Sequence, residues 1–175
     1  LERLLAATTD LDMAMLHKLV VEQNLFGKRS ESSRKLTLDR LTSLYGLKQR
    51  SVVSEALMFL WRAAEPSPVL ALLAALARDP VLRASATAVL SALPGESFSY
   101  PKISLVLERA YEGRWSEKML RSAAQNCASS WTQSGHLIGR VKKIRQRAPS
   151  TPAAAAYAVF LAHVSGFSGA ALLDS

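Results

Sequence analysis

The sequence predicts a mainly α-helical protein with one small β-hairpin. Apolar residues recur at helical spacing along the 175-residue chain, and 49 % of its residues are hydrophobic, so it can bury a substantial core. Apolar and polar residues alternate around a turn at Gly139–Arg140, which indicates paired strands. This hydrophobicity excludes an intrinsically disordered chain, because disordered chains are poor in apolar residues.

The N-terminal part of the chain is predicted to be entirely helical. Asp10 is placed to cap the first helix, Gly46 ends the second and Ser51 caps the third. The last two helices each begin with proline at a first-turn position, where the missing N–H is not needed. The expected helices span residues 11–25, 31–44, 51–65, 68–79 and 80–93.

The loop at residues 94–101, PGESFSYP, is the clearest break in the sequence. We therefore expect an N-terminal helical domain at residues 1–93 and a second domain at residues 94–175. The second domain should contain a helix, a turn at Gly113, a long helix capped by Ser116, the hairpin and two C-terminal segments. Its expected helical segments span 101–112, 116–134, 152–165 and 169–173.

Positive charge is concentrated in two segments. The chain has a formal charge of +8, with 22 Lys and Arg against 14 Asp and Glu. Residues 28–50 carry seven basic and two acidic residues, and residues 114–147 carry eight basic residues and one acidic residue. Their net charges of +5 and +7 leave the remainder of the chain at −4. An anionic partner, above all nucleic acid, is expected at these segments.

The order of a short helix, a tight turn, a longer helix and a basic hairpin is typical of a winged helix-turn-helix, in which the longer helix enters the major groove of DNA. The long helix has a predicted buried stripe of Leu120, Ala123, Ala124, Cys127 and Trp131. Its other side offers Arg, Gln and Asn, which can bond base edges. The predicted base-reading residues are Lys118, Arg121, Gln125 and Asn126.

In the hairpin, alternation predicts Leu137, Val141 and Ile144 inward and the cations outward, where they could neutralise phosphates. The same pattern is also typical of a basic edge strand that only faces solvent. In the first basic segment, the cations are expected to form a rim around an apolar core helix, and they could touch the same nucleic acid. The candidate phosphate contacts are Arg140, Lys142, Lys143, Arg145 and Arg147 in the hairpin, and Lys28, Arg29, Arg34 and Lys35 in the first segment.

An enzyme is not expected. His17, His136 and His163 lack metal-ligand spacing, and the chain contains no phosphate-binding, zinc-protease or serine-hydrolase motif. Cys127, the single cysteine, is placed as a small core residue, and a chain with one cysteine fits the reducing cytoplasm. We predict no catalytic residue, metal, cofactor or small-molecule substrate. Residues 152–173 are long enough to cross a bilayer, but they are Ala-rich and interrupted by polar residues, which favours a buried helix.

The chain resembles the small BrxA-type proteins of bacterial BREX phage-defence clusters. The resemblance rests on helix order and on the runs VVEQNLFGKRSESSRKL, DRLTSLYGL, ARDPVLRASA and SEKMLRSAAQNCASSWTQSGHL. It implies an all-helical protein with winged-helix-like modules and no enzymatic activity, which binds DNA within a larger defence assembly. The residues thus point to double-stranded DNA as partner. Two alternatives stay open, namely an adaptor whose basic faces dock an acidic protein, and an RNA-binding helical protein.

Overall fold

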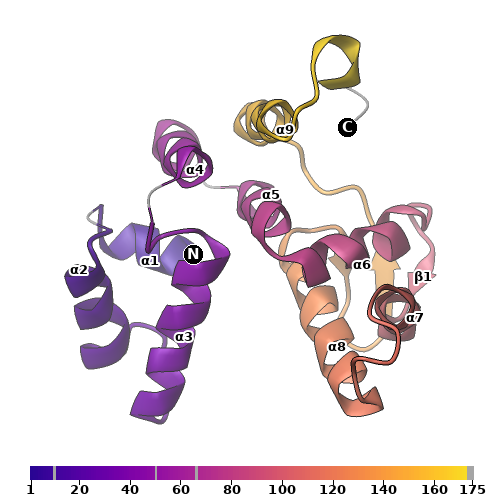
Figure 1. Cartoon of the computed structure of the whole chain (residues 1–175), viewed down its shortest axis with the longest axis horizontal. Helices are drawn as coiled ribbons and strands as arrows, with labels where there is room; N and C mark the ends of the chain where they lie inside the picture. Colours follow the sequence, from indigo (N-terminus) through magenta and orange to yellow (C-terminus); the bar gives the residue numbers. More distant parts are fainter. Residues whose placement is uncertain (10, 50, 66, 173–175) are drawn as a thin grey trace. The chain divides into compact units, whose positions relative to one another are not determined.

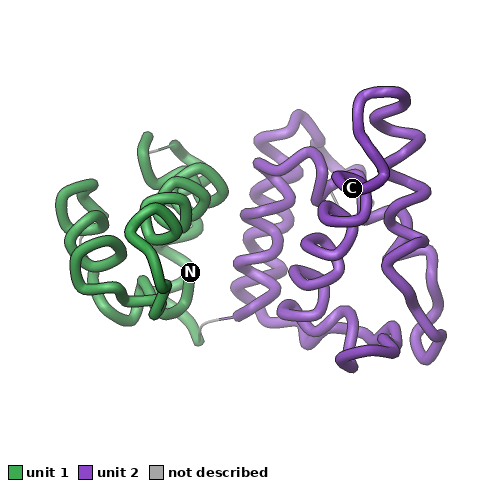
Figure 2. Tube along the Cα trace, turned by 90° about the horizontal axis from the view of Figure 1, so that it is seen from below, with its two compact units in different colours: residues 1–66 green, residues 67–175 purple. Residues whose placement is uncertain are grey.

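The chain divides into two units, residues 1–66 and residues 67–175 (Figure 2). This computed structural model describes residues 1–9, 11–49, 51–65 and 67–172. The division lies well before the boundary at 93/94 that the sequence predicted. The reason is that the helices at Pro68–Arg78 and Pro80–Leu90, which lie between the predicted and the observed boundary, pack on the C-terminal elements.

In the described residues of unit 1, helices joined by loops are the regular secondary structure, and there is no strand. In place of the helix predicted at 11–25, the structure has a shorter α-helix at Met13–His17, which continues as a π-helical turn at Lys18–Glu22. A further helix, at Glu2–Ala7, was not predicted. Predicted N-cap Asp10 lies outside the described residues, and the structure has Asp12 in that role, accepting a 2.9 Å bond from the Ala14 N–H. The elements are α1 (Glu2–Ala7), α2 (Met13–His17), η1 (Lys18–Glu22), α3 (Glu31–Leu44) and α4 (Val52–Ala63).

Serine caps begin the two longer helices of unit 1. The Ser30 hydroxyl accepts from the Ser33 N–H at the start of α3. Ser51 and Ser54 form a reciprocal capping box at the start of α4, which confirms Ser51 as its N-cap. Each cap satisfies backbone donors that a helix end leaves without an intrahelical partner.

Unit 2 combines helices with a small sheet (Figure 1). Proline stands in the first turn of α5, α6, α7 and α9, and Ser116 caps α8 as predicted, since its hydroxyl accepts from the Met119 N–H. Asp79 ends α5 and also caps α6, because its carboxylate accepts from the N–H groups of Val81 and Leu82. The elements are α5 (Pro68–Arg78), α6 (Pro80–Leu90), β1 (Ser97–Phe98), α7 (Tyr100–Ala110), α8 (Glu117–Gln133), β2 (Leu137–Ile138), β3 (Lys143–Arg145), α9 (Pro152–Val164) and the 3₁₀ turn η2 (Gly169–Leu172).

The predicted hairpin gains a third strand. β3 lies in the centre of an antiparallel sheet, with β1 on one side and β2 on the other. In the register, Ile144 stands opposite both Ser97 and Ile138, and Arg145 stands opposite Leu137. The protein is therefore mainly α-helical with a small three-stranded sheet, as the sequence predicted apart from the third strand.

The core of unit 2 joins α5 and α6 to the elements that follow them. Helix α6 packs on α7 and α8, and α5 packs on α8 and α9. The buried Trp131 indole N–H donates a 2.8 Å bond to the Ser85 hydroxyl, which links α8 to α6. A cut at 93/94 would run through this core, which explains why the loop at 94–101 is not a domain boundary.

The Ala-rich C-terminal segment forms α9, which ends at Val164 and buries Tyr157 against α5. Gly166 follows the helix in a left-handed conformation, with φ of 96°. Among the described residues, no helix combines the length and the apolar character needed to cross a membrane.

Candidate nucleic-acid interface

The long helix α8 has two chemically distinct sides. Ala124, Cys127, Ala128 and Trp131 are buried. The predicted base-reading residues all lie exposed on the other side of the helix, and Arg121 also forms an ion pair of 3.2 Å with Glu117 one turn earlier. Those exposed residues are Lys118, Arg121, Gln125 and Asn126.

Strand β3 faces the opposite way from the one that alternation in the hairpin predicted, whereas β2 faces as predicted. Leu137 is fully buried, as expected, but Val141 is 92 % exposed and Ile144 is 40 % exposed, so these two predictions were wrong. Val141 belongs to the turn and not to a strand. Ile144 lies on the outer side of the sheet with its register partners Ser97 and Ile138, which are exposed, whereas Phe98 and Leu137 occupy the inner side.

Arg145 is a buried structural residue, and its prediction as a solvent-facing phosphate contact is therefore wrong. Only 8 % of the residue is exposed. Its Nε donates a 3.0 Å bond to the Val89 carbonyl, and its Nη1 donates to the carbonyls of His136 and Gln146. Burial also lowers the pKa of its guanidinium. The Val89 carbonyl is in the last turn of α6, so Arg145 completes the end of that helix.

Lys143 holds the hairpin against α8. Its ammonium group donates to the Thr132 hydroxyl at 2.8 Å and to the Gly139 carbonyl at 3.3 Å, and the residue is half-buried. Gly139 has φ of 98°, and a Cβ at this position would collide with the Lys142 carbonyl. The turn therefore requires glycine and is fixed to the helix by a lysine. The remaining predicted hairpin cations, Arg140, Lys142 and Arg147, are exposed.

A groove of about 770 Å³ runs between the exposed side of α8, the hairpin turn and the start of α7. Gln125, Arg140 and Lys143 line it, so three of the predicted site residues share one hollow. Its lining residues, all in the described part of the chain, include no Asp or Glu. They are Phe98, Ser99, Tyr100, Pro101, Gln125, Ala128, Ser129, Thr132, Gln133, Gly139, Arg140, Val141 and Lys143.

Sequence reasoning missed the wall of this groove formed by Ser99, Tyr100 and Pro101. These residues lie far from the hairpin in the sequence, and only the pairing of β1 with β3 brings them beside it. The exposed Lys102 adds a cation next to this wall, with its Nζ 5.7 Å from the centre of the Phe98 ring. The basic motif KIRQR gave no indication of a partner strand.

Two of the four predicted cations of unit 1 already bind protein groups. The Arg34 guanidinium donates a 2.6 Å bond to the Val21 carbonyl, and Lys35 pairs with Glu31 at 2.6 Å. Lys28 and Arg29 are exposed in the loop before α3. In unit 2, by contrast, two predicted cations line a groove, namely the exposed Arg140 and Lys143, whose ammonium group binds Thr132 and Gly139.

The residues considered for catalysis do not converge. The described residues contain no group of three or more His, Cys, Asp or Glu that could hold a metal ion. Burial raises the pKa of the Cys127 thiol to about 11, so the thiol is protonated at neutral pH. Burial also lowers the pKa of His136 to about 4, with a smaller effect from Arg145, and its Nδ1 lies 2.8 Å from the Ser134 hydroxyl.

Comparison with family models, curated proteins and solved structures gave no match to the chain. The function must therefore be inferred from the geometry of the groove and from the chemistry of its residues. That geometry places amide, hydroxyl, aromatic and cationic side chains along one open hollow. Such a combination suits a polyanion that also presents hydrogen-bonding edges.

Proposed function

We propose that this protein is a non-enzymatic DNA-binding protein that holds duplex DNA with unit 2. The observation that carries the proposal is the groove described above, in which the exposed side of α8 and the hairpin turn meet without an acidic lining residue. Phosphate contacts supply affinity and base contacts supply sequence preference, and the groove offers side chains for both. Gln125 can bond adenine, and Arg140 can bind a phosphate or a guanine.

The order of elements supports the same proposal. Helix α7, the turn at Gly113, helix α8 and the β2–β3 hairpin follow one another as in a winged helix-turn-helix, and β1 extends the hairpin to three strands. Helix α8 has 17 residues and is therefore about 25 Å long. A helix of that size fits the major groove of B-DNA, which is about 12 Å wide.

The exposed cations determine how DNA binding should depend on salt. Five of the predicted cationic contacts in unit 2 are exposed, namely Lys118, Arg121, Arg140, Lys142 and Arg147. Each of these five cations is expected to displace about one counterion from the duplex, which gives a log–log salt slope near −4.5. The affinity should then fall roughly 500-fold between about 50 mM and 200 mM salt.

Fluorescence anisotropy on duplex DNA, single-stranded DNA and structured RNA tests the proposal. We expect the tightest binding to duplex DNA, and the double variant Arg140→Ala, Lys142→Ala should reduce the salt slope by about 2. Arg83→Ala, at an exposed position on α6, is the matched control and should leave the slope unchanged. Absence of duplex binding at low salt would overturn the proposal, and tighter binding to RNA would replace it with the RNA-binding alternative.

We further propose that this DNA binding serves a BREX-like defence assembly. The support is the resemblance of the helix order and of the quoted sequence runs to BrxA-type proteins. The test is the gene neighbourhood: a methyltransferase, an ATPase and a phosphatase-like gene alongside would agree with the assignment. A neighbourhood without them would contradict it.

A further inference from the structure

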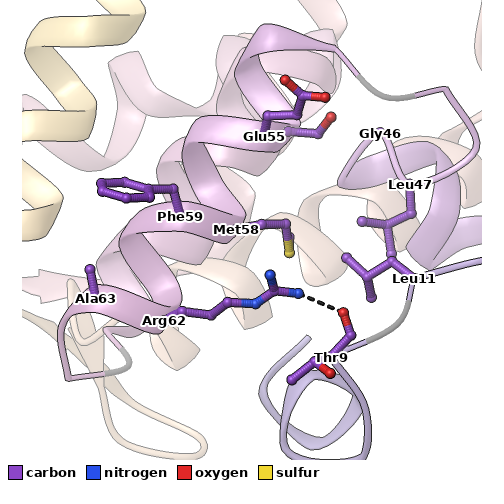
Figure 3. A pocket seen from close by; sticks show the side chains of 10 residues that line it. Thr9, Leu11, Gly46, Leu47, Glu55, Met58, Phe59, Arg62 and Ala63 are labelled. Carbon is purple, nitrogen blue, oxygen red and sulfur yellow. Dashed lines mark hydrogen bonds between the residues drawn. The ribbon is translucent and has the colours of Figure 1, made fainter.

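Unit 1 contains a hollow of about 470 Å³ that the proposed DNA contacts do not use (Figure 3). One wall is the outer side of α4, and the other is formed by Leu11 and Leu47. Met58 and the Arg62 side chain lie between these walls, and Arg62 donates a 2.6 Å bond to the Thr9 carbonyl (Figure 3). The hollow is therefore mostly apolar, with a cation at one end.

The side of α4 that borders this hollow is apolar in its centre and charged at both ends. Glu55, Phe59 and Arg62 line the hollow. Val52 continues the same stripe towards the start of α4, because the four residues are spaced three, four and three apart. Phe59 is 69 % exposed and Val52 is 65 % exposed. A large aromatic side chain thus stands exposed beside an apolar hollow, which is unfavourable in water.

The charges of the stripe are arranged symmetrically about Phe59. Glu55 and Arg62 are seven residues apart, or about 10.5 Å along the helix axis. When two copies of α4 pair antiparallel around a two-fold axis near Phe59, Glu55 of each copy faces Arg62 of the other. Both charge pairs are then satisfied at once, which is the self-complementarity that a two-fold interface requires.

We propose that this stripe and the hollow beside it form the interface of a homodimer. In the dimer, Phe59 of each copy enters the hollow of the other, between Met58 and the wall of Leu11 and Leu47. The Glu55–Arg62 pairs close both ends of the interface. The occupant is thus a second copy of this chain, because its charges are complementary to the stripe in the antiparallel orientation.

The charges at Glu55 and Arg62 also compensate the macrodipole of α4, since the acid is in the first turn and the base in the last. A single charge substitution could therefore weaken the helix as well as a dimer. A mixture of two complementary variants separates these effects. In Glu55→Arg both positions of the stripe are positive, and in Arg62→Glu both are negative.

Sedimentation of the chain with both units, at concentrations from ~1 to ~100 μM, tests the proposal. We expect the unsubstituted chain to dimerise, and Phe59→Ser, Glu55→Arg and Arg62→Glu to weaken the dimer by about tenfold or more. An equimolar mixture of Glu55→Arg and Arg62→Glu should form a heterodimer, because opposite charges then meet at both ends. Arg40→Glu, at an exposed position on α3, should dimerise like the unsubstituted chain.

Circular dichroism of each variant shows whether it is folded. The proposal is overturned when the unsubstituted chain stays monomeric over this concentration range. A stripe that binds a different protein instead of a second copy would give this result. A dimer that persists in Phe59→Ser, or variants that remain folded but form no heterodimer when mixed, would also overturn it. None of these outcomes depends on DNA binding, so the interface can fail while the proposed function stands.

Discussion

Replacing Arg145 with alanine should unfold unit 2 more easily and should leave the salt dependence of DNA binding unchanged. Arg145 is buried and joins three backbone carbonyls. The His136 carbonyl keeps a 2.8 Å bond from the Gln146 N–H after the substitution, whereas the Val89 carbonyl loses the donor at the end of α6. The main loss is therefore one charge-assisted bond together with the buried stem of the side chain.

The magnitude follows from these contacts. A hydrogen bond to a charged group contributes about 1.5–3 kcal/mol, and the removed stem adds to this value. Relief from burying a guanidinium offsets part of the loss. We expect a net destabilisation of about 2–3 kcal/mol, which lowers the urea midpoint by roughly 1 M when the denaturant slope is near 2 kcal/mol/M.

Lys142→Ala is the matched comparison, because Lys142 is an exposed cation close to Arg145 in the chain. It should change the unfolding free energy by less than about 0.5 kcal/mol and reduce the salt slope on duplex DNA by about 1. Urea unfolding followed by circular dichroism and anisotropy titrations measure the two quantities. If Arg145→Ala is as stable as the unsubstituted chain and loses one unit of salt slope, the structural role assigned to Arg145 is refuted.

Three further predictions concern the same unit. Burial lowers the pKa of His136 to about 4, so the folded state resists protonation of this side chain. The free energy of unfolding should therefore fall by about 2 kcal/mol as the pH drops from about 6.5 to about 4. Unfolding measured as a function of pH should show this loss, and His136→Gln should abolish it. The Cys127 thiol is 5 % exposed with a pKa of about 11, so a thiol reagent should modify it only after urea unfolds the chain, and rapid labelling of the native protein would contradict this. Gly139→Ala should destabilise the turn by about 1–3 kcal/mol and weaken DNA binding, and unchanged binding would exclude the turn from the interface.

Local chemistry in the sequence predicted most helix starts correctly. Ser51 and Ser116 act as N-caps, and Pro68 and Pro80 stand in first turns, because capping needs only residues within a few positions. The exposed side of α8 was predicted for the same reason, since helical spacing determines which residues share a side.

Features that depend on distant residues could not be predicted. The position of the domain boundary depends on α6 packing against α8. The face of β3 depends on β1, a strand of two residues in which Phe98 pairs with Lys143, 45 residues later in the chain. Arg145 was predicted to be exposed like the cations beside it in the sequence. Its main partner is a backbone carbonyl, that of Val89, and the pattern of side chains in the sequence does not indicate such a partner. A two-residue strand is likewise too short to show alternation.

The bonds from α6 to α8 and to β3 have a consequence for local opening of the protein. Ser85 holds the Trp131 indole and Val89 holds the Arg145 guanidinium, so one helix carries anchors for both halves of the proposed DNA-binding surface. Amide protons in α6, α8 and β3 should therefore exchange with solvent through one common opening event. The proposed DNA-binding surface would then open and close as one unit, at the rate at which α6 opens.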